Sequence, residues 1–221
     1  MSAPAPHRPT RSDGEESRER LLQAGLRLFA NQGFSKTSTR ELAEAACVNV
    51  AAISYYYGDK QGLYRAVFFE PQEAHQIDPA AITDPGLSLR DAMTRFITAF
   101  LEPLREGERA RLCMKLHIRE MLEPTGLWEE EIEQGIRPLH EAMLTILCRH
   151  FGLARPDDDL QRLAFSLAAL GVYLHVGHDV IDRLAPGLNG SPEAIDCWTD
   201  GLVRSGLAMI EAEKVRREGQ P

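Results

Sequence analysis

Residues 38–57 read STRELAEAACVNVAAISYYY, and this stretch decides the fold. Ser38 is a favourable helix N-cap, and Glu41 three residues later completes a capping box, so a short helix is predicted to begin here. Residues 47–49 interrupt the helical pattern, and a second helix of about seven residues, 50–56, is predicted to follow. Two short helices joined by a three-residue turn predict a helix-turn-helix.

In a helix-turn-helix the first helix braces the second, which reads base edges in the major groove of DNA. Residues 50–56 are mostly small or neutral, which allows close approach to bases, and the first turn of the brace carries groups that can hold phosphate. The candidate DNA contacts are Thr39, Arg40, Asn49, Val50, Ala51, Ala52, Ser54, Tyr55, Tyr56 and Lys60. Ile53 and Tyr57 are expected in the core, and packing alone is the alternative role for Tyr55 and Tyr56.

The flanking sequence extends this motif into a domain of residues 17–70. An amphipathic helix is predicted over residues 17–32 and ends at Gly33, and another is predicted over 59–70 with Asp59 as its cap. Residues 1–16 are rich in Pro, Ser and charge, which predicts a flexible arm. The helix over 59–70 is the candidate element that transmits a signal between the two halves of the chain.

Downstream, nearly every segment keeps the 3.6-residue period of a helix, so the predicted fold class is all-α. Residues 71–87 contain three prolines and are predicted to be a loop or linker, followed by a second domain over 88–216. Its predicted helices span residues 88–106, 108–122, 128–151, 158–183 and 192–216, with a kink or division at Pro138.

The stretch TSTRELAEAACVNVAAISYYYGDKQGLYRAVF, residues 37–68, resembles the DNA-binding domain of TetR-type bacterial transcriptional regulators. The resemblance covers residues 17–69, including the preceding helix that ends in Leu28-Phe29 and Gly33-Phe34. One departure is Cys47, because the family usually places glycine in this turn. A residue other than glycine at positive φ costs about 1–2 kcal/mol, so a strained or altered turn is expected.

Residues 118–153 are similar to the ligand-sensing half of the CecR subgroup, regulators implicated in antibiotic sensitivity. The resemblance implies a cytoplasmic homodimer that binds a palindromic double-stranded DNA operator, most often as a repressor, and responds to a small organic effector. An effector pocket is expected among the helices of residues 88–183. Its candidate lining residues, each of which could instead be plain core, are Met114, His117, Met121, Trp128 and Tyr173.

Two C-terminal segments are candidates for the dimer interface. Residues 163–174 are apolar nearly all round, which predicts burial on both sides, and the last helix carries an apolar stripe with small residues. Two such helices from each subunit would form a four-helix interface, with ordinary monomer core as the alternative. The candidate interface residues are Phe165, Leu170, Ile195, Trp198, Leu202 and Met209.

The net charge of −8 at first argues against a nucleic-acid partner, but its distribution is uneven. Residues 1–70 have a net charge of +1 and residues 71–221 a net charge of −9. Binding to nonspecific DNA is therefore expected to be modest. The first residues lack a secretory signal, no segment is long enough to span a bilayer, and the four cysteines without C-x-x-C spacing are expected to be reduced, buried and inert.

Two functions from other classes are the alternatives. One is a helical protein that binds a small molecule without an operator, and the other is a metal-dependent hydrolase using His175, His178 and Asp179. Neither a Walker loop, a dinucleotide fingerprint nor a nucleophile elbow occurs, so an enzyme is disfavoured and no cofactor or metal is expected. The acidic runs 129–131 and 157–159 are expected to be solvated first turns of helices.

Overall fold

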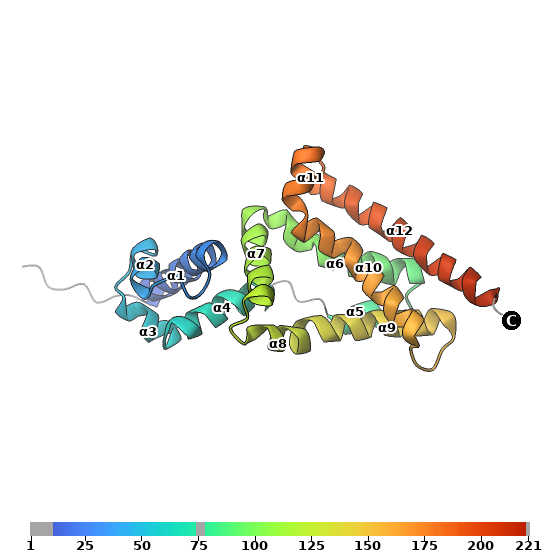
Figure 1. Ribbon diagram of the computed structural model, residues 1–221, viewed down its shortest axis with the longest axis horizontal. Coiled ribbons are helices and arrows are strands. Elements are labelled where there is room, and N and C mark those ends of the chain that lie inside the picture. Colours follow the sequence, from blue (N-terminus) through green and yellow to red (C-terminus); the bar gives the residue numbers. More distant parts are fainter. Residues whose placement is uncertain (1–10, 74–77, 220–221) are drawn as a thin grey trace, which may run out of the picture. The chain divides into compact units, whose positions relative to one another are not determined.

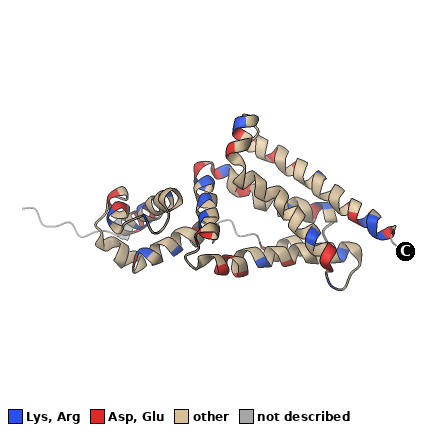
Figure 2. Ribbon diagram, viewed as in Figure 1, with Lys and Arg blue, Asp and Glu red and all other residues tan. Residues whose placement is uncertain are grey.

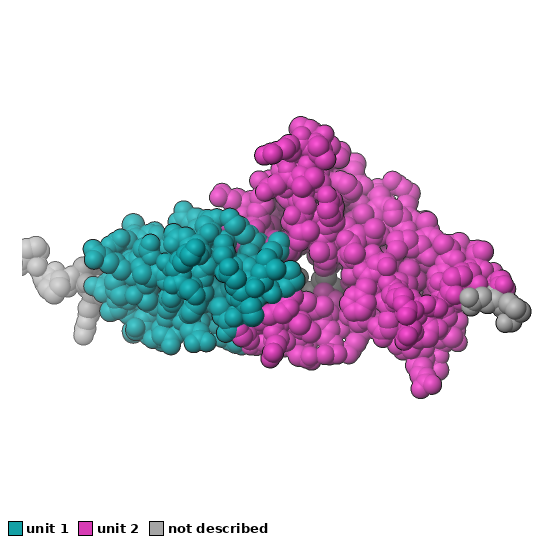
Figure 3. All heavy atoms as spheres, viewed as in Figure 1, with its two compact units in different colours: residues 1–74, 115–125 teal, residues 75–114, 126–221 magenta. Residues whose placement is uncertain are grey.

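The computed structural model describes residues 11–73 and 78–219, and over these residues the chain forms helices without a strand (Figure 1). The predicted all-α class is confirmed. The chain divides into two compact units: unit 1 comprises residues 1–74 and 115–125, and unit 2 comprises residues 75–114 and 126–221 (Figure 3). The predicted split near residue 71 omitted residues 115–125, because a contact between segments so far apart leaves no local signal in the sequence.

Unit 1 contains four helices and the second half of a fifth. They are α1 (Arg11–Gln32), α2 (Thr39–Ala45), α3 (Ala51–Tyr57), α4 (Lys60–Glu73) and the part of α7 (Glu108–Leu122) from Lys115 onward. The core side chains come from every helix and are at most 1% exposed; the largest are Leu21, Phe29, Leu42, Ile53, Leu63, Tyr64, Phe68 and Leu116. The short helices α2 and α3 each have one apolar face on this core, and their other faces remain exposed.

The first helix begins earlier than predicted. The prediction placed residues 11–16 in a flexible arm, whereas α1 starts at Arg11; residues 1–10 lie outside the described residues. Side-chain bonds one turn apart support the added turn, because Arg20 Nη1 bonds the carboxylate of Glu16 at 3.0 Å. The other end is as predicted, with Gly33 at φ 84°. A Cβ on residue 33 would lie about 3 Å from the Arg119 side chain. Close packing therefore favours glycine at this position in addition to the positive φ.

A buried polar cluster joins α4 to α7 within unit 1. The Tyr64 hydroxyl donates to Oε2 of Glu120 at 2.8 Å, and the backbone N–H of Thr125 donates to Oε1 of Glu120 at 2.7 Å. Both Tyr64 and Glu120 are at most 1% exposed. Burial, reinforced by the bond to Glu120, raises the pKa of Tyr64 above its ordinary value. Residues 115–125 are therefore an integral part of unit 1.

Unit 2 is a bundle built around one apolar core. Its elements are α5 (Pro79–Thr83), α6 (Leu89–Leu101), the 3₁₀ helix η1 (Glu102–Glu106), the first half of α7, α8 (Leu127–Glu131), the π-helix η2 (Ile132–Ile136), α9 (Arg137–Phe151), α10 (Asp158–Val176), α11 (His178–Leu184) and α12 (Pro192–Glu218). Helix α6 contacts α9, α10 and α12, so it lies at the centre of the bundle (Figure 1). Core side chains include Met93, Leu101, Ile146, Leu147, Leu160 and Ile210.

Three predicted segments of unit 2 differ from the structure. The predicted loop of residues 71–87 contains α5, whose N-cap is Asp78 and whose Ile82 is buried in the core. The predicted helix 88–106 ends at Leu101, where a 3₁₀ turn with Pro103 in its first turn takes over. The predicted helix 158–183 is broken at Gly177 into α10 and α11. The predicted division near Pro138 is present as η2, directly before the proline-containing first turn of α9.

The two acidic runs behave differently. Asp157 caps α10 as expected, accepting from the Leu160 N–H at 2.9 Å, and it also pairs with both terminal nitrogens of Arg217 at 2.8 and 2.9 Å. Glu131 was expected to be solvated, but it is only 8% exposed. The helical segment turns it inward toward Gly135, where a Cβ would lie 2.6 Å from its carboxylate oxygen.

The length and hydropathy of the helices decide whether one of them could span a membrane. Among the described residues, no single helix is long and apolar enough to cross a membrane. Helices α10 and α11 together reach the length and composition of such a span, but they are bent by 69° at the break between them.

Candidate nucleic-acid interface

Helix α2 begins at the predicted capping box. The Glu41 N–H donates to the Ser38 hydroxyl at 3.1 Å, and the Ser38 N–H donates to the Glu41 carboxylate at 2.8 Å. These bonds from Ser38 lower the pKa of Glu41. The capping box leaves Thr39 and Arg40 exposed in the first helical turn, where backbone N–H groups and the guanidinium can meet phosphate.

The turn between α2 and α3 closes with Cys47 in the left-handed region, at φ 54°. The Cys47 N–H donates to the Glu44 carbonyl at 3.1 Å, and the Val48 N–H donates to the Ala43 carbonyl at 3.0 Å. This pair of bonds is a Schellman motif, which normally has glycine at the position of Cys47. Cys47 is the only residue other than glycine with positive φ in the described ranges 11–73 and 78–219, so the expected strain is present.

The helix predicted over residues 50–56 with Asn49 as its cap begins one residue later, at Ala51, and the N-cap position is Val50, which makes no side-chain cap bond. The Asn49 side-chain oxygen accepts from the Ala51 N–H at 2.9 Å, so its amide stabilises the turn directly before α3. Ile53 faces the core at 1% exposure, and the opposite face of α3 is open: Tyr55 is 82% exposed and Val50 is 45% exposed. Packing is therefore not the role of Tyr55, and the exposed face has the small and neutral composition that base contacts need.

The other two tyrosines of α3 are less exposed. Tyr57, expected in the core, is only half-buried, and its hydroxyl donates to the Arg18 carbonyl at 3.1 Å. Burial raises the pKa of Tyr57 above its ordinary value. Tyr56 is also half-buried, and its ring meets the edge of Tyr55 with centroids 4.8 Å apart. A phosphate contact through the Tyr56 hydroxyl stays a prediction.

The two cationic candidates have different surroundings. Arg40 is 83% exposed and its Nε pairs with Glu44 at 2.9 Å, which raises the pKa of Arg40. The Lys60 ammonium donates to the carbonyls of Phe34 and Thr37, both at 3.0 Å, and lies 4.2 Å from the Phe34 ring centroid. Two of the three N–H groups of Lys60 thus hold the loop between α1 and α2, which leaves one for phosphate.

Basic residues do not dominate unit 1. Figure 2 shows acidic and basic residues interspersed along its helices, in line with the net charge of +1 for residues 1–70. Phosphate contacts from Thr39, Arg40, the remaining N–H of Lys60 and the N-termini of helices stay a prediction.

The five predicted pocket residues are divided between the two units. His117 and Met121 belong to unit 1, where the His117 ring stacks on Phe68 with centroids 4.3 Å apart. Met114, Trp128 and Tyr173 belong to unit 2. Helix α7 passes from one unit to the other between residues 114 and 115, a division that helical periodicity does not reveal.

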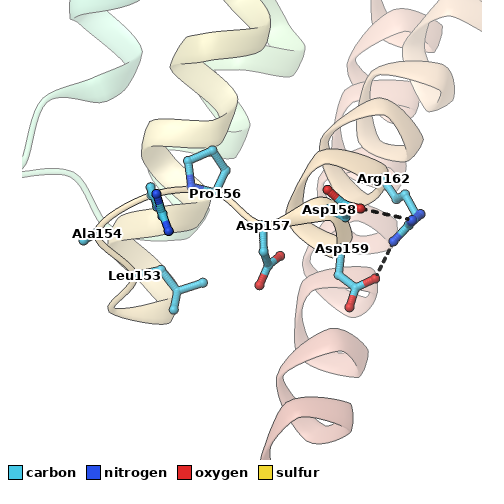
Figure 4. A pocket seen from close by; sticks show the side chains of 8 residues that line it. Leu153, Ala154, Pro156, Asp157, Asp158, Asp159 and Arg162 are labelled. Carbon is cyan, nitrogen blue, oxygen red and sulfur yellow. Dashed lines mark hydrogen bonds and ion pairs between the residues drawn. The ribbon is translucent and has the colours of Figure 1, made fainter.

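None of these five candidates lines either of two cavities that the described residues form. The larger, about 780 Å³, lies at the start of α10 and is lined by residues 153–159 and Arg162. Figure 4 shows Arg162 directed at Asp158 and Asp159, with the shorter pair at 2.8 Å. The other, about 340 Å³, lies within unit 1 and is lined by Phe34, Ser35, Tyr64, Arg119, Glu123, Pro124 and Thr125.

The predicted dimer residues fall on two different faces. Ile195 and Leu202 are 3% and 8% exposed in the core of unit 2, and Leu170, Trp198 and Met209 pack against that core. Phe165 alone of the six points away from it, at 61% exposure. The apolar stripe of α12 therefore belongs in large part to the monomer core, the alternative that the sequence leaves open.

Part of the apolar segment 163–174 forms an exposed stripe along α10, which continues to Val176. Phe165, Val172 and Val176 are 61%, 41% and 46% exposed and are spaced as one helical face. The exposed face of α12 carries the small residues Cys197, Ser205, Ala208 and Ala212 and the 60% exposed Val215. One side of the segment 163–174 is thus buried in unit 2, and the other, which includes the interface candidate Phe165, is exposed in the single chain.

The exposure of the cysteines and the surroundings of His175 and His178 differ from residue to residue. Cys47 and Cys197 are exposed, contrary to the expected burial, whereas burial raises the pKa of Cys113 to about 11. His178 Nδ1 lies 3.1 Å from the Asp182 carboxylate, and His175 contacts the Phe100 carbonyl at 3.1 Å. His178 Nδ1 is buried and, despite this short distance, makes no hydrogen bond with the described residues, whereas His175 has the Phe100 carbonyl as its partner.

Comparison with known proteins assigns both halves of the chain. Residues 21–67 match the model of the bacterial regulatory proteins of the tetR family, and residues 89–212 match the C-terminal domain of the HTH-type transcriptional dual regulator CecR. The CecR of Shigella flexneri is 28% identical, covering 89% of this chain and 95% of the relative. The transcriptional repressor AcnR of Corynebacterium glutamicum is 34% identical, covering 92% of this chain and 98% of the relative.

Solved structures agree on the fold. A tetR-family regulatory protein from Rhodococcus RHA1 has a TM-score of 0.63 at 20% identity, covering 88% of this chain and 96% of that one. The SmeT–triclosan complex has a TM-score of 0.59 at 21% identity, covering 84% and 90%. Such relatives are transcriptional regulators and not enzymes, which removes the hydrolase alternative. The chain belongs to the tetR family of bacterial regulatory proteins, and it is a DNA-binding transcriptional regulator with a C-terminal domain of the CecR type.

Proposed function

We propose that this regulator is a ligand-responsive repressor that binds a palindromic operator as a homodimer, with α3 of each subunit in the major groove of one half-site. The observation that carries the proposal is the open face of α3, where Tyr55 is 82% exposed although it is a large aromatic residue. Thr39 and Arg40 at the exposed start of α2 would hold phosphate and set the register of α3.

A second subunit supplies what one seven-residue helix lacks. One α3 offers few base contacts, whereas two on a palindrome double them. The exposed stripe of Phe165, Val172 and Val176 on α10, beside the small exposed residues of α12, is the surface that we assign to the second copy. Covering it would remove large apolar side chains from water, and small residues on α12 would let two helices approach closely. The interface thus uses this face in place of Ile195 and Leu202.

Repression and ligand response rest on the relatives. AcnR is a repressor by name, CecR is a dual regulator, and SmeT has been solved with triclosan, a small organic molecule. An effector that prefers the conformer in which the two α3 helices are wrongly spaced would weaken DNA binding, and by linkage DNA would weaken effector binding by the same factor. A regulator of this kind acts in the bacterial cytoplasm, where its operator lies.

The test uses a duplex that the full chain selects from a random-sequence pool, followed by fluorescence anisotropy with single variants. Tyr55→Ala is expected to weaken binding to the selected duplex by about tenfold or more, because stacking and base contacts of an aromatic residue are lost. Tyr173→Ala removes a tyrosine that is 53% exposed in unit 2 and serves as the matched control. Equal affinities of both variants and the wild type would refute the role of α3.

The alternative of a helical small-molecule binder without an operator makes a different prediction. Its helix-turn-helix would serve only packing, so the random pool would yield no enriched sequence and the salt dependence would be that of nonspecific binding alone. Lys60→Ala is not a suitable probe here, because Lys60 also holds the carbonyls of Phe34 and Thr37. Loss of affinity in that variant would mix a phosphate contact with a loosened loop.

A further inference from the structure

Arg20 on α1 reaches across to the end of α2. Its Nε donates to the Ala46 carbonyl at 3.1 Å, although the two residues are 26 positions apart. Its other two nitrogens bond the Glu16 carboxylate at 3.0 Å and the Ser17 hydroxyl at 3.1 Å, one turn earlier on α1. Every nitrogen of the guanidinium therefore has a protein partner, and Glu16 and Ser17 aim Nε at α2.

The carbonyl that Arg20 reaches belongs to the turn that joins α2 to α3. The Schellman bonds of Cys47 and Val48 satisfy the carbonyls of Glu44 and Ala43, and the Ala46 N–H bonds the Leu42 carbonyl. The Ala46 carbonyl lies beyond these bonds, and Ala46 itself is only 2% exposed. A buried carbonyl requires a donor, and a cation near the end of a helix also offsets the negative end of its dipole.

The same turn carries the strain of Cys47 at φ 54°. Glycine would close this turn without cost, whereas a cysteine needs surrounding contacts to hold it in the left-handed region. The bond from Arg20 is a charge-assisted contact to the residue directly before Cys47, and such bonds are stronger than neutral ones. Arg20 thus stabilises the turn at the point where its sequence departs from glycine.

We propose that Arg20 is a positioning residue for DNA recognition, which holds the Cys47 turn and thereby sets the direction of α3 without touching DNA. Helix α1 then fixes both ends of the recognition element, because the Arg18 carbonyl accepts the Tyr57 hydroxyl at the other end of α3 at 3.1 Å. The first turns of α1, before Ser17, contribute to this positioning because they include Glu16, whose carboxylate bonds Arg20. The inference rests on the proposed role of α3 in reading DNA.

The experiment compares variants of the full chain on the duplex selected by the wild type. Arg20→Ala is expected to lower the affinity for this duplex about tenfold, equivalent to about 1.4 kcal/mol. Arg27→Ala is the matched control, because Arg27 is an exposed arginine on the same helix, and it is expected to change little. Amide hydrogen exchange of Cys47 and Val48 is expected to become faster in Arg20→Ala and to stay unchanged in Arg27→Ala.

Two readouts separate positioning from other roles. In Arg20→Ala/Cys47→Gly the turn no longer needs outside support, so most of the lost affinity is expected to return. The slope of log affinity against log salt is expected to stay that of the wild type in Arg20→Ala, whereas a lost phosphate contact would reduce it by about 0.9. A reduced slope with no rescue by glycine would overturn the proposal in favour of a direct phosphate contact.

The variant Glu16→Gln/Ser17→Ala keeps Arg20 but removes its two side-chain partners. Its DNA affinity tests the proposal if Arg20→Ala does not fold. Its expected affinity is severalfold below that of the wild type, although removal of a carboxylate near DNA would by charge alone strengthen binding. Unchanged affinity in this variant or in Arg20→Ala would overturn the inference and leave the proposed function standing. A wild-type chain that selects no duplex would overturn the proposed function itself, and the inference with it.

Discussion

The Tyr64 hydroxyl donates a 2.8 Å hydrogen bond to the Glu120 carboxylate, 56 positions away in the chain and wholly inside unit 1. Removing the hydroxyl in Tyr64→Phe is expected to cost about 1–2 kcal/mol of unfolding free energy, because a buried carboxylate loses a donor. Urea denaturation followed by circular dichroism measures this cost. Tyr173→Phe, on an exposed tyrosine, should stay within about 0.5 kcal/mol of the wild type, and an equal loss in both variants would contradict the account.

The same tyrosine predicts a response to alkaline pH. The pKa of Tyr64 is raised in the folded chain, whereas an unfolded tyrosine titrates near pH 10. Its contribution to stability is thus complete below about pH 10 and is lost as the pH rises toward the folded pKa. The free energy of unfolding should fall less steeply above about pH 10 in Tyr64→Phe than in the wild type; parallel curves would show that Tyr64 is not shielded.

The Cys47 turn predicts a stabilising substitution. Cys47→Gly should raise the unfolding free energy by about 0.5–1 kcal/mol, because relief at φ 54° exceeds the added entropy of the unfolded chain. Cys197→Gly, at an exposed position inside α12, should lower it by about 0.3–0.5 kcal/mol. The opposite signs make thermal denaturation of the two variants a direct comparison, and destabilisation by both would show that the turn tolerates cysteine without strain.

Asp157 predicts a response to acid. Hydrogen bonds from Arg217 and from the Leu160 N–H lower the pKa of Asp157, so its stabilising effect is present above about pH 4, where the unfolded side chain is already ionised, and is lost as the pH falls below that value. Asp157→Asn keeps the helix cap and removes the charge. The variant should be less stable by up to about 1 kcal/mol at neutral pH, a difference that shrinks toward pH 2.

The neighbouring variant Asp158→Asn controls for the general effect of charge at the start of α10. The Asp158 side chain is 90% exposed, and its contact with Arg162 is 3.7 Å long. No comparable change with pH is expected from it. A gap between Asp157→Asn and the wild type that is independent of pH would rule out the pairing with Arg217 as its cause.

The exposed stripe on α10 predicts a separation of assembly from folding. Phe165→Glu should convert the dimer to a folded monomer, because a charge enters an apolar interface, while Ile195→Ala should lose about 2–5 kcal/mol of stability. Analytical ultracentrifugation of both variants measures the oligomeric state, and denaturation measures the free energy of unfolding. A Phe165→Glu chain that remains dimeric would move the interface to another surface.

Local features of unit 1 could be predicted from the sequence because neighbouring residues determine them. The caps at Ser38 and Asp59, the side-chain bond of Asn49 before α3 and the left-handed positions at Gly33 and Cys47 follow from side-chain chemistry within a few residues. Periodicity likewise predicted the all-α class, and the resemblance to the family led to the regulator.

Features that depend on distant contacts could not be predicted. Arg20 and Ala46 meet only after α1 folds across α2, and Glu120 becomes buried only beside Tyr64. Periodicity also cannot distinguish the core side of α12, where Ile195 lies, from a side that faces a partner. Periodicity likewise gave no sign that the five effector candidates are divided between the two units, since the boundary falls within the continuous helix α7.

The most direct test of the central claim, that two subunits place α3 in two half-sites, is a titration of the wild-type chain against two duplexes. One is the selected palindrome, and the other has one half-site scrambled and the other intact. The account predicts an even number of chains on the palindrome and a loss of affinity on the half-scrambled duplex of at least about a hundredfold, because half of the base contacts disappear. Equal affinity for the two duplexes, or one chain bound per palindrome, would contradict it.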